Sequence, residues 1–328
     1  MLNKVLVGVV AVVLTLGLSG HVQAATTVNL ATADSFAVLA GTAVTNVPTS
    51  AITGNMGLSP AAGSNYGAGV TTAQVTGTIY AVDSSGPAGA AGNNPTLMTS
   101  AKNDLTAAYL DAAGRTPTTT FVAGDNQLGG QVLAPGVYAF GHGTTANLVG
   151  TLTLDGLGDA NSVFIFQASS DLVTASSSVV ALANSAQACN VFWQVTSSAT
   201  LGTSSTFVGT IMALTSVGLN TSATMVGRAL ARNAAVTLDQ NTITRPTCAA
   251  AAAAAATTSN STSTSTSTTT PTATTSTTST AAATTIPGLP NTGLPVNNKN
   301  TPWNIAIPAG ILLVALISGA FLIKRNSA

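Results

Sequence analysis

A constant interval between similar segments limits what this chain can fold into. Segments 206–208, 224–226 and 242–244 are equally spaced, and each places a large apolar residue between two β-branched ones. This alternation is typical of a strand with one buried side, and a fixed period lets each strand stack on the one before it. The pattern predicts a β-solenoid. Its aligned positions are Thr206, Thr224 and Thr242, then Phe207, Met225 and Ile243, then Val208, Val226 and Thr244.

Glycine marks a second repeat. Five segments share an apolar residue, Thr or Val, Gly, any residue, and an apolar or small residue; they are 52–56, 75–79, 148–152, 207–211 and 225–229. We interpret each as a short strand that alternates inward and outward about a tight glycine position. The interval from Gly77 to Gly150 is far longer than the regular spacing, which indicates an insertion between coils.

The insertion carries a helical pattern over residues 95–113. Asn94 suits an N-terminal cap, Pro95 the first turn and Gly114 the C-terminal stop. We expect the helix to lie along one side of the solenoid and to cover it. The residues predicted to form one apolar stripe are Leu97, Ala101, Leu105, Ala108 and Ala112.

Charge is scarce in this chain. It has nine Asp, no Glu and nine Lys or Arg, and residues 25–248 hold five of the basic residues against all nine Asp, a net charge of −4. Nucleic acid binding needs clustered basic residues, so it is excluded.

The chain also lacks the residues that catalysis or metal binding would need. His142 is the only histidine between residues 25 and 248, it lies in a predicted turn, and no Gly-x-Ser-x-Gly segment supplies a nucleophile. Asp155 and Asp159 could share a calcium ion, but a plain turn between strands is favoured. Two cysteines and one remote histidine cannot complete a zinc site. The sequence predicts no enzyme, no metal and no cofactor.

Two cysteines remain, Cys189 and Cys248. In an exported chain an even count favours a disulfide. Two buried thiols are the alternative.

Residues 1–24 have the features of a secretory signal. Lys4 precedes an apolar stretch over 5–18, and residues 22–24 end in the small-residue pattern that a signal peptidase recognises. Ala25 is therefore the expected first residue of the mature chain. Residues 25–248 then form the predicted folded head.

Residues 249–288 consist almost entirely of Ala, Thr, Ser and Pro, with no charge and no aromatic residue. Such a segment has nothing to bury, so it cannot offset the entropy lost on ordering. We predict a disordered stalk whose hydroxyl groups are possible glycosylation points.

Residues 289–328 resemble a Gram-positive cell-wall sorting signal. Leu289, Pro290, Asn291, Thr292 and Gly293 match an LPxTG pentamer, and a spacer, an apolar run over 305–323 and Lys324-Arg325 follow. The resemblance implies that a sortase cuts after Thr292 and joins it to peptidoglycan at the cell surface. The alternative is an ordinary membrane anchor through 305–323, which is just long enough to span a bilayer.

Seven segments of the head carry a resemblance to a known family; they are 36–41, 52–55, 108–115, 133–138, 163–167, 190–195 and 227–232. These segments resemble the ice-binding proteins with a discontinuous right-handed β-solenoid. The resemblance implies a mainly β, triangular solenoid whose N-terminal coil packs beside the C-terminal ones, with one long helix alongside.

In that family the ice-binding surface lies on one flat face, and some members show a Thr-Ala/Gly-x-Thr/Asn motif there. Thr42-Ala43-Val44-Thr45 matches the motif, and Thr221-Ser222-Ala223-Thr224 matches it with Ser at the second position. The alternative is that Thr is simply a good outward strand residue. The candidate ice-binding residues are Thr42, Thr45, Thr53, Thr76, Thr206, Thr221, Thr224, Thr242 and Thr244.

These features predict a wall-anchored ice-binding protein that adheres to ice, inhibits its recrystallisation, or does both. The expected partners are an ice surface, a sortase and peptidoglycan, and the head is expected to be monomeric. The alternative is a surface adhesin or structural module of the same fold that does not bind ice. A polysaccharide lyase is disfavoured because the head has too few charges.

Overall fold

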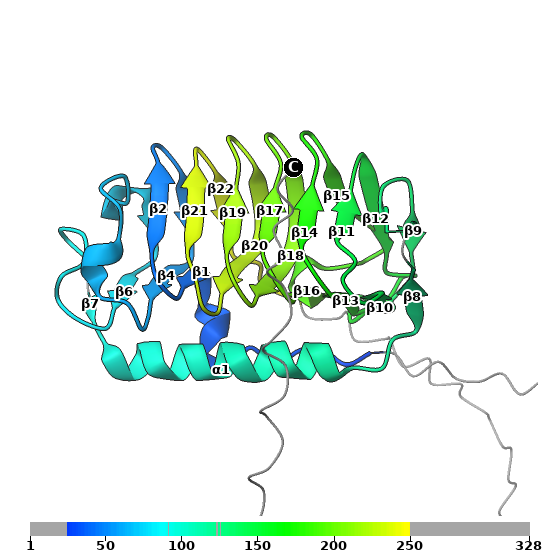
Figure 1. The fold of residues 1–328 in the computed structure, drawn as a ribbon, viewed down its shortest axis with the longest axis horizontal. Coiled ribbons are helices and arrows are strands. Elements are labelled where there is room, and N and C mark those ends of the chain that lie inside the picture. The colour runs from blue at the N-terminus through cyan, green and yellow to red at the C-terminus, as the bar shows by residue number, and fades with distance from the viewer. Residues whose placement is uncertain (1–24, 91, 123, 125, 250–328) are drawn as a thin grey trace, which may run out of the picture. The chain divides into compact units, whose positions relative to one another are not determined.

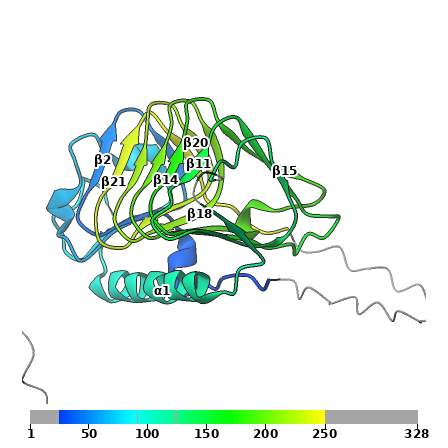
Figure 2. The same ribbon diagram turned by 45° about the vertical axis from the view of Figure 1, so that its right-hand side comes forward.

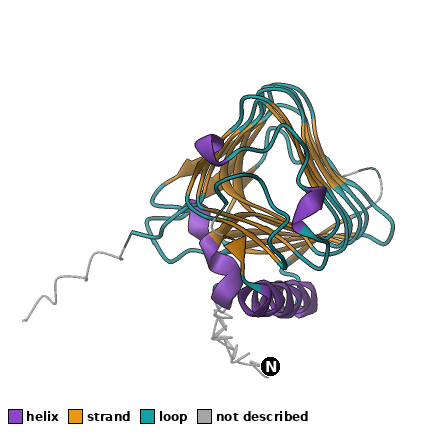
Figure 3. Cartoon of the chain, turned by 90° about the vertical axis from the view of Figure 1, so that its left-hand side faces the viewer, coloured by secondary structure: helices purple, strands orange, loops and turns teal. Residues whose placement is uncertain are grey.

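Parallel strands stacked in coils make up most of the structure, a computed structural model that describes residues 25–90, 92–122, 124 and 126–249 (Figure 1). Seen along the stack, the coils outline a triangle (Figure 3). The predicted signal, sorting signal and nearly all of the predicted stalk lie outside the described residues. Among the described residues, no helix combines the length and apolar character needed to cross a membrane.

One side of the triangle, here called the helix face, is a ladder of ten strands. From one end to the other the strands are β7 (Gly92–Asn93), β6 (Ile79–Ala81), β4 (Asn55–Leu58), β1 (Phe36–Ala40), β20 (Thr224–Ala231), β18 (Thr206–Ala213), β16 (Val191–Val195), β13 (Phe164–Ala168), β10 (Gly136–Phe140) and β8 (Thr119–Phe121).

The same sheet continues around a corner because β18 and β20 belong to two sides. Their first residues pair with a second run of strands, and their last residues pair within the helix face. The second run is β9 (Val132–Leu133), β12 (Thr151–Asp155), β15 (Val179–Ala183), β18, β20, β22 (Thr242–Thr244), β3 (Ala51–Thr53) and β5 (Val75–Thr76).

The third side, here called the six-stranded face, is a separate parallel sheet. Its order is β11 (Ala146–Leu148), β14 (Leu172–Thr174), β17 (Ala199–Leu201), β19 (Val217–Leu219), β21 (Val236–Asp239) and β2 (Val44–Val47).

Glycine allows the chain to bend between the two sides of the larger sheet. Gly209 on β18 is opposite Gly227 on β20. A Cβ atom on Gly227 would lie 1.9 Å from the carbonyl oxygen of Gly209, so only glycine permits the two backbones to approach there. The sequence repeat centred on glycine is thus largely a corner of the solenoid.

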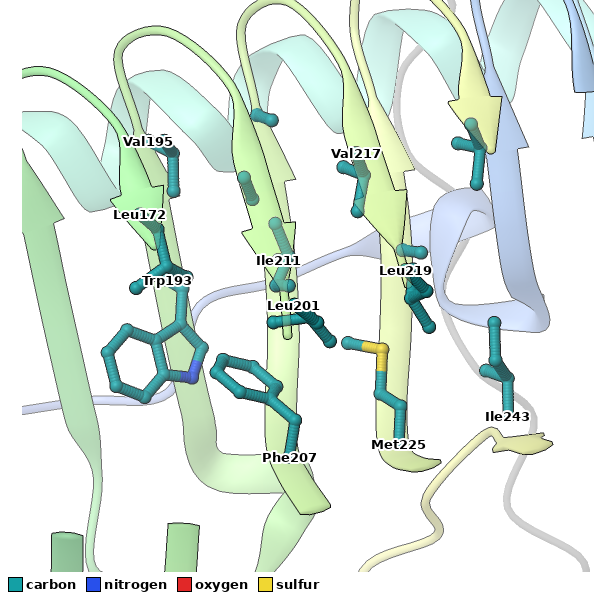
Figure 4. Packing of buried hydrophobic residues seen from close by; sticks show 14 of the residues in the cluster. Leu172, Trp193, Val195, Leu201, Phe207, Ile211, Val217, Leu219, Met225 and Ile243 are labelled. Atoms are coloured by element: carbon teal, nitrogen blue, oxygen red, sulfur yellow. The ribbon is translucent and has the colours of Figure 1, made fainter. Parts of the chain in front are cut away.

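Inward side chains fill the triangle. Phe207, Met225 and Ile243 are at most 1% exposed and follow one another along the stack (Figure 4). Trp193 extends the row, with its ring centroid 5.1 Å from that of Phe207 and 3.9 Å from that of Phe166. Each such side chain stabilises the fold by roughly 1.5–3 kcal/mol through burial.

Helix α1 (Pro95–Gly114) runs the length of the helix face (Figures 1 and 2). Asn94 caps it by accepting a hydrogen bond from the Leu97 backbone N–H at 3.0 Å. The predicted stripe faces the solenoid: Ala101, Leu105, Ala108 and Ala112 are buried, and Leu97 is partly buried and packs against the same cluster. The buried residues are Met98, Ala101, Leu105, Ala108, Tyr109 and Ala112.

Helix α1 also explains why the solenoid is discontinuous. The first coils end at β7, the helix carries the chain along the whole stack, and the later coils return from β8 (Figure 1). The last coil therefore meets the first one, with β1 pairing β20, β3 pairing β22 and β2 pairing β21.

An ion pair between a buried arginine and a half-exposed aspartate joins the two coils at this seam. Arg228 on β20 is 2% exposed, and its guanidinium donates to the Asp34 carboxylate, to the Asp34 carbonyl at 2.9 Å and to the Thr210 hydroxyl at 3.1 Å. Burial lowers the pKa of Arg228, and the adjacent Asp34 opposes this shift. Arg245 donates to the other Asp34 oxygen at 3.1 Å.

Lys102 ties the helix to the solenoid. Its ammonium donates to the carbonyls of Ala231 at 2.8 Å and Arg232 at 2.6 Å, at the end of β20. Burial, with the nearby Arg232 charge, lowers the pKa of Lys102 to about 8. The predicted fold class, mainly β with a β-solenoid and one long helix alongside, is confirmed.

Candidate functional site

One side of the solenoid presents a nearly continuous layer of small β-branched side chains. We call it the threonine face and define it by the exposed outward residues of β18, β20, β22, β3 and β5. None of these exposed residues is charged. The exposed members are Thr206, Thr224, Val226, Thr242, Thr244, Ala51, Thr53 and Thr76.

The strand register arranges these side chains in two rows. In the first row Thr206 is opposite Thr224, Thr224 opposite Thr242, and Thr242 opposite Ala51. The second row consists of Val226, Thr244, Thr53 and Thr76 in consecutive strands.

The rows form a two-dimensional grid. Neighbouring strands lie about 4.8 Å apart, and alternate residues along one strand are roughly 7 Å apart. Each Thr offers a methyl group and a hydroxyl, and its branched Cβ restricts rotation about χ1. The Thr224 hydroxyl lies 3.4 Å from that of Thr206, a long contact that leaves both groups accessible to water.

The grid is rigid because each outward residue alternates with a buried one. On β18, β20 and β22 these are Phe207, Met225 and Ile243, and on β3 it is Ile52, which is 2% exposed. A threonine in this face cannot move far without disturbing the packing inside the triangle.

Six of the nine predicted site residues meet on the threonine face, and three do not. Thr45 lies on β2 in the six-stranded face, where it is opposite Thr237 on β21. Thr42 is exposed in the turn between β1 and β2. Thr221 lies in the turn before β20 and donates to Asp239. Of the two motif matches, only the one ending at Thr224 enters the threonine face.

The structure adds members that sequence reasoning missed. Ala51 and Val226 fill grid positions, and the first row continues through Val179 to Thr151 on β12. The repeat does contain Val226, so its outward position was predictable. Ala51, Val179 and Thr151 carry no such signal, because they lie outside the regular spacing.

The other two faces do not present an open, uncharged grid of side chains. The helix face is covered by α1. On the six-stranded face Gly218 leaves a gap between Thr200 and Thr237, and an open groove of about 380 Å³ there is lined in part by Asp239.

The turns considered for chemistry are structural. Asp155 accepts hydrogen bonds from the Leu157 N–H and the Asn184 amide, and Asp159 accepts one from the Asn161 N–H. His142 is exposed in a turn. Within the described residues, no group of three or more His, Cys, Asp or Glu side chains could hold a metal.

The described head is thus a β-solenoid with an uncharged threonine grid on one side and a long covering helix on another. Residues 38–244 match the model of the ice-binding-like family. The chain belongs to this family, whose members are non-enzymatic, so the prediction that it is not an enzyme is confirmed.

Known relatives agree with this assignment. The chain is 40% identical over 244 residues to an ice-binding protein of Nostoc sp. (strain HG1), covering 74% of this chain and 83% of that one. It is 39% identical over 231 residues to an ice-binding protein of Colwellia sp., covering 70% and 88%.

Solved structures show the same fold. A glycosylated ice-binding protein from an Arctic yeast matches with a TM-score of 0.62 and 32% identity, covering 70% of this chain and 98% of that one. An ice-binding protein from an Antarctic biological consortium matches with a TM-score of 0.59 and 37% identity, covering 68% and 93%.

Proposed function

We propose that this chain binds ice through the threonine face and thereby adheres to ice and inhibits its recrystallisation. The observation that carries the proposal is the register of Thr206, Thr224 and Thr242 in one row beside Thr244, Thr53 and Thr76 in the next. The names of the relatives support the same ligand.

The chemistry of the grid supports this ligand physically. Methyl groups order the water beside them, and the threonine hydroxyls can hydrogen-bond into that ordered layer. A rigid surface gives up little conformational entropy when it binds, so many weak contacts can add up. A charge in the face would disturb the layer, and none lies among the outward residues of this face.

The direct test is an ice-recrystallisation assay with the purified chain at micromolar concentration. Slower growth of ice grains, together with faceting of a single crystal, supports the proposal. Unaltered ice growth in both assays would contradict it and would favour an adhesin or structural module of the same fold.

We also propose that the chain is exported and displayed on a cell wall. The pentamer at 289–293, the apolar run over 305–323 and the basic pair at 324–325 support a sortase and peptidoglycan as partners. An ice-binding head held on a wall can fasten a cell to ice. Retention in the membrane through 305–323 is the competing outcome.

A further inference from the structure

The chain leaves the described solenoid directly after a strand of the threonine face. β22 carries Thr242 and Thr244, and Cys248 follows shortly after it. β22 is a short strand that pairs with β20 on one side and β3 on the other. If β22 were the only attachment, a pull on the chain beyond residue 249 would act first on this short strand in the middle of the threonine face.

A covalent bond bypasses that strand. Cys248 forms a disulfide with Cys189, and the two Cα atoms are 5.6 Å apart. Cys189 lies in the short helix Ala188–Asn190, which leads directly into β16.

Hydrogen bonds hold the same point. The Ala249 N–H donates to the Gln187 side-chain oxygen at 2.7 Å, and the Gln187 amide donates to the Ala249 carbonyl at 3.1 Å. The Gln187 amide also donates to the Ala160 carbonyl at 2.8 Å, and Asn190 donates to that carbonyl at 3.2 Å. Ala249 is thus fixed to the segment around Cys189 as well as to its own strand.

β16 is much better able to resist tension than β22. It pairs along its length with β13 on one side and with β18 on the other, and all five of its residues are buried. Its Trp193 stacks on Phe166 and donates to the Val208 carbonyl at 3.0 Å. Extracting β16 would require breaking both ladders and the aromatic row at once.

We propose that the Cys189–Cys248 bond is a tension clamp, which passes force from the C-terminal side of the head into β16 and keeps β22 in the threonine face. The need for such a clamp rests on the proposed function, in which the face holds ice and the C-terminal segment holds a cell. The clamp itself is a property of the head and can be measured without ice.

The test is single-molecule pulling of the full chain between position 206 on β18, labelled through a clickable amino acid, and the C-terminus. We expect the disulfide-bonded chain to unfold without an early step. A Cys189→Ser, Cys248→Ser double variant should release β22 first, at lower force, with a gain of at most ~32 Å for the segment 240–248.

In the matched control the chain is pulled between positions 206 and 142, the latter in an exposed turn, so that the force does not act on β22. There the disulfide-bonded chain and the double variant should show the same first unfolding force. Identical traces for both chains in the C-terminal geometry would overturn the clamp, and so would an equal difference in both geometries.

If the double variant does not fold, the native chain is instead reduced in solution with a phosphine. The phosphine takes the oxygen atom of a water molecule to become its oxide, and the disulfide takes up two electrons and two protons to become two thiols. Hydrogen exchange should then show lost protection at 242–244 and retained protection in β18; retained protection at 242–244 contradicts the clamp. Absence of ice binding with a working clamp would reject the proposed function alone.

Discussion

Arg228 donates to the carboxylate of Asp34, a residue 194 positions earlier in the chain, and this ion pair joins the last coil of the solenoid to the first. The guanidinium is 2% exposed, whereas the Asp34 side chain is about half exposed. Because Arg228 cannot release its proton, its buried charge depends on this partner. Removing Asp34 should therefore destabilise the contact between the first and last coils.

Asp34→Ala should lower the free energy of unfolding by about 2–3 kcal/mol, because it leaves a buried guanidinium without its counter-charge. The loss should be smaller than for a fully buried ion pair, because Asp34 is half exposed and water can reach the guanidinium once its carboxylate is removed. Chemical denaturation followed by circular dichroism measures the effect.

The control is Asp111→Ala, which breaks an i,i+4 pair with Arg115 on the surface of α1. That change should cost less than about 0.5 kcal/mol. Equal losses for the two variants would show that the stability of the seam does not depend on the Asp34–Arg228 pair.

The free energy of unfolding should depend on pH through the buried side chain of Lys102. Its pKa is about 8 in the folded chain against an ordinary value of 10.5, so the unfolded chain binds more protons between these values. The free energy of unfolding should therefore rise with pH in this window, by about 2 kcal/mol up to pH ~9.5. Below pH ~8 this contribution should be constant.

Lys102→Met supplies the comparison, since other titrating groups are common to both chains. The slope of unfolding free energy against pH should be smaller in the variant, whatever its absolute stability. Measurements stop near pH ~9.5 because burial raises the pKa of Tyr66 and of Tyr138, which lowers stability at higher pH. Parallel pH profiles would contradict the role given to Lys102.

Local pattern was sufficient to predict the regular part of this fold. Thr206, Thr224 and Thr242 recur at equal intervals because each coil adds one strand to the same side, so the sequence period equals the structural one. The cap, first turn and end of α1 were predictable for the same reason, since they depend on neighbouring residues. The full burial of Met98 and Tyr109 beside the predicted stripe was not predictable, because it depends on where the solenoid surface lies.

The candidate site was predictable only in part, for a topological reason. Ala51 joins the threonine row because β3 pairs with β22, and that pairing arises from the passage of the chain along α1 and back. Thr45 matches a motif but lies on another side, because a short motif does not specify which side of the triangle its strand joins.

Thr292→Ala tests the proposed wall attachment. If a sortase joins Thr292 to peptidoglycan, the variant should be lost from the wall fraction released by muramidase and should appear in the membrane or the medium. Immunoblots of the three fractions measure this. Asn291→Ala is the matched control, because the third position of an LPxTG pentamer is variable. Unchanged wall attachment of the Thr292 variant would contradict the sortase proposal.

Thr242→Tyr tests the proposed binding surface itself. The side chain points to solvent from the centre of the first row, between Thr224 and Ala51. A tyrosine would stand above its neighbours and separate the grid from a flat crystal surface. We expect the concentration needed to inhibit recrystallisation to rise roughly ten-fold or more, which corresponds to about 1.4 kcal/mol of binding. The free energy of unfolding should change by less than about 0.5 kcal/mol. Thr237→Tyr on the six-stranded face is the matched control, because Thr237 is also an exposed threonine within a strand of the last coil. If the Thr237 variant loses activity and the Thr242 variant keeps it, the ice-binding surface lies on the six-stranded face, and the threonine face is the wrong side of the triangle.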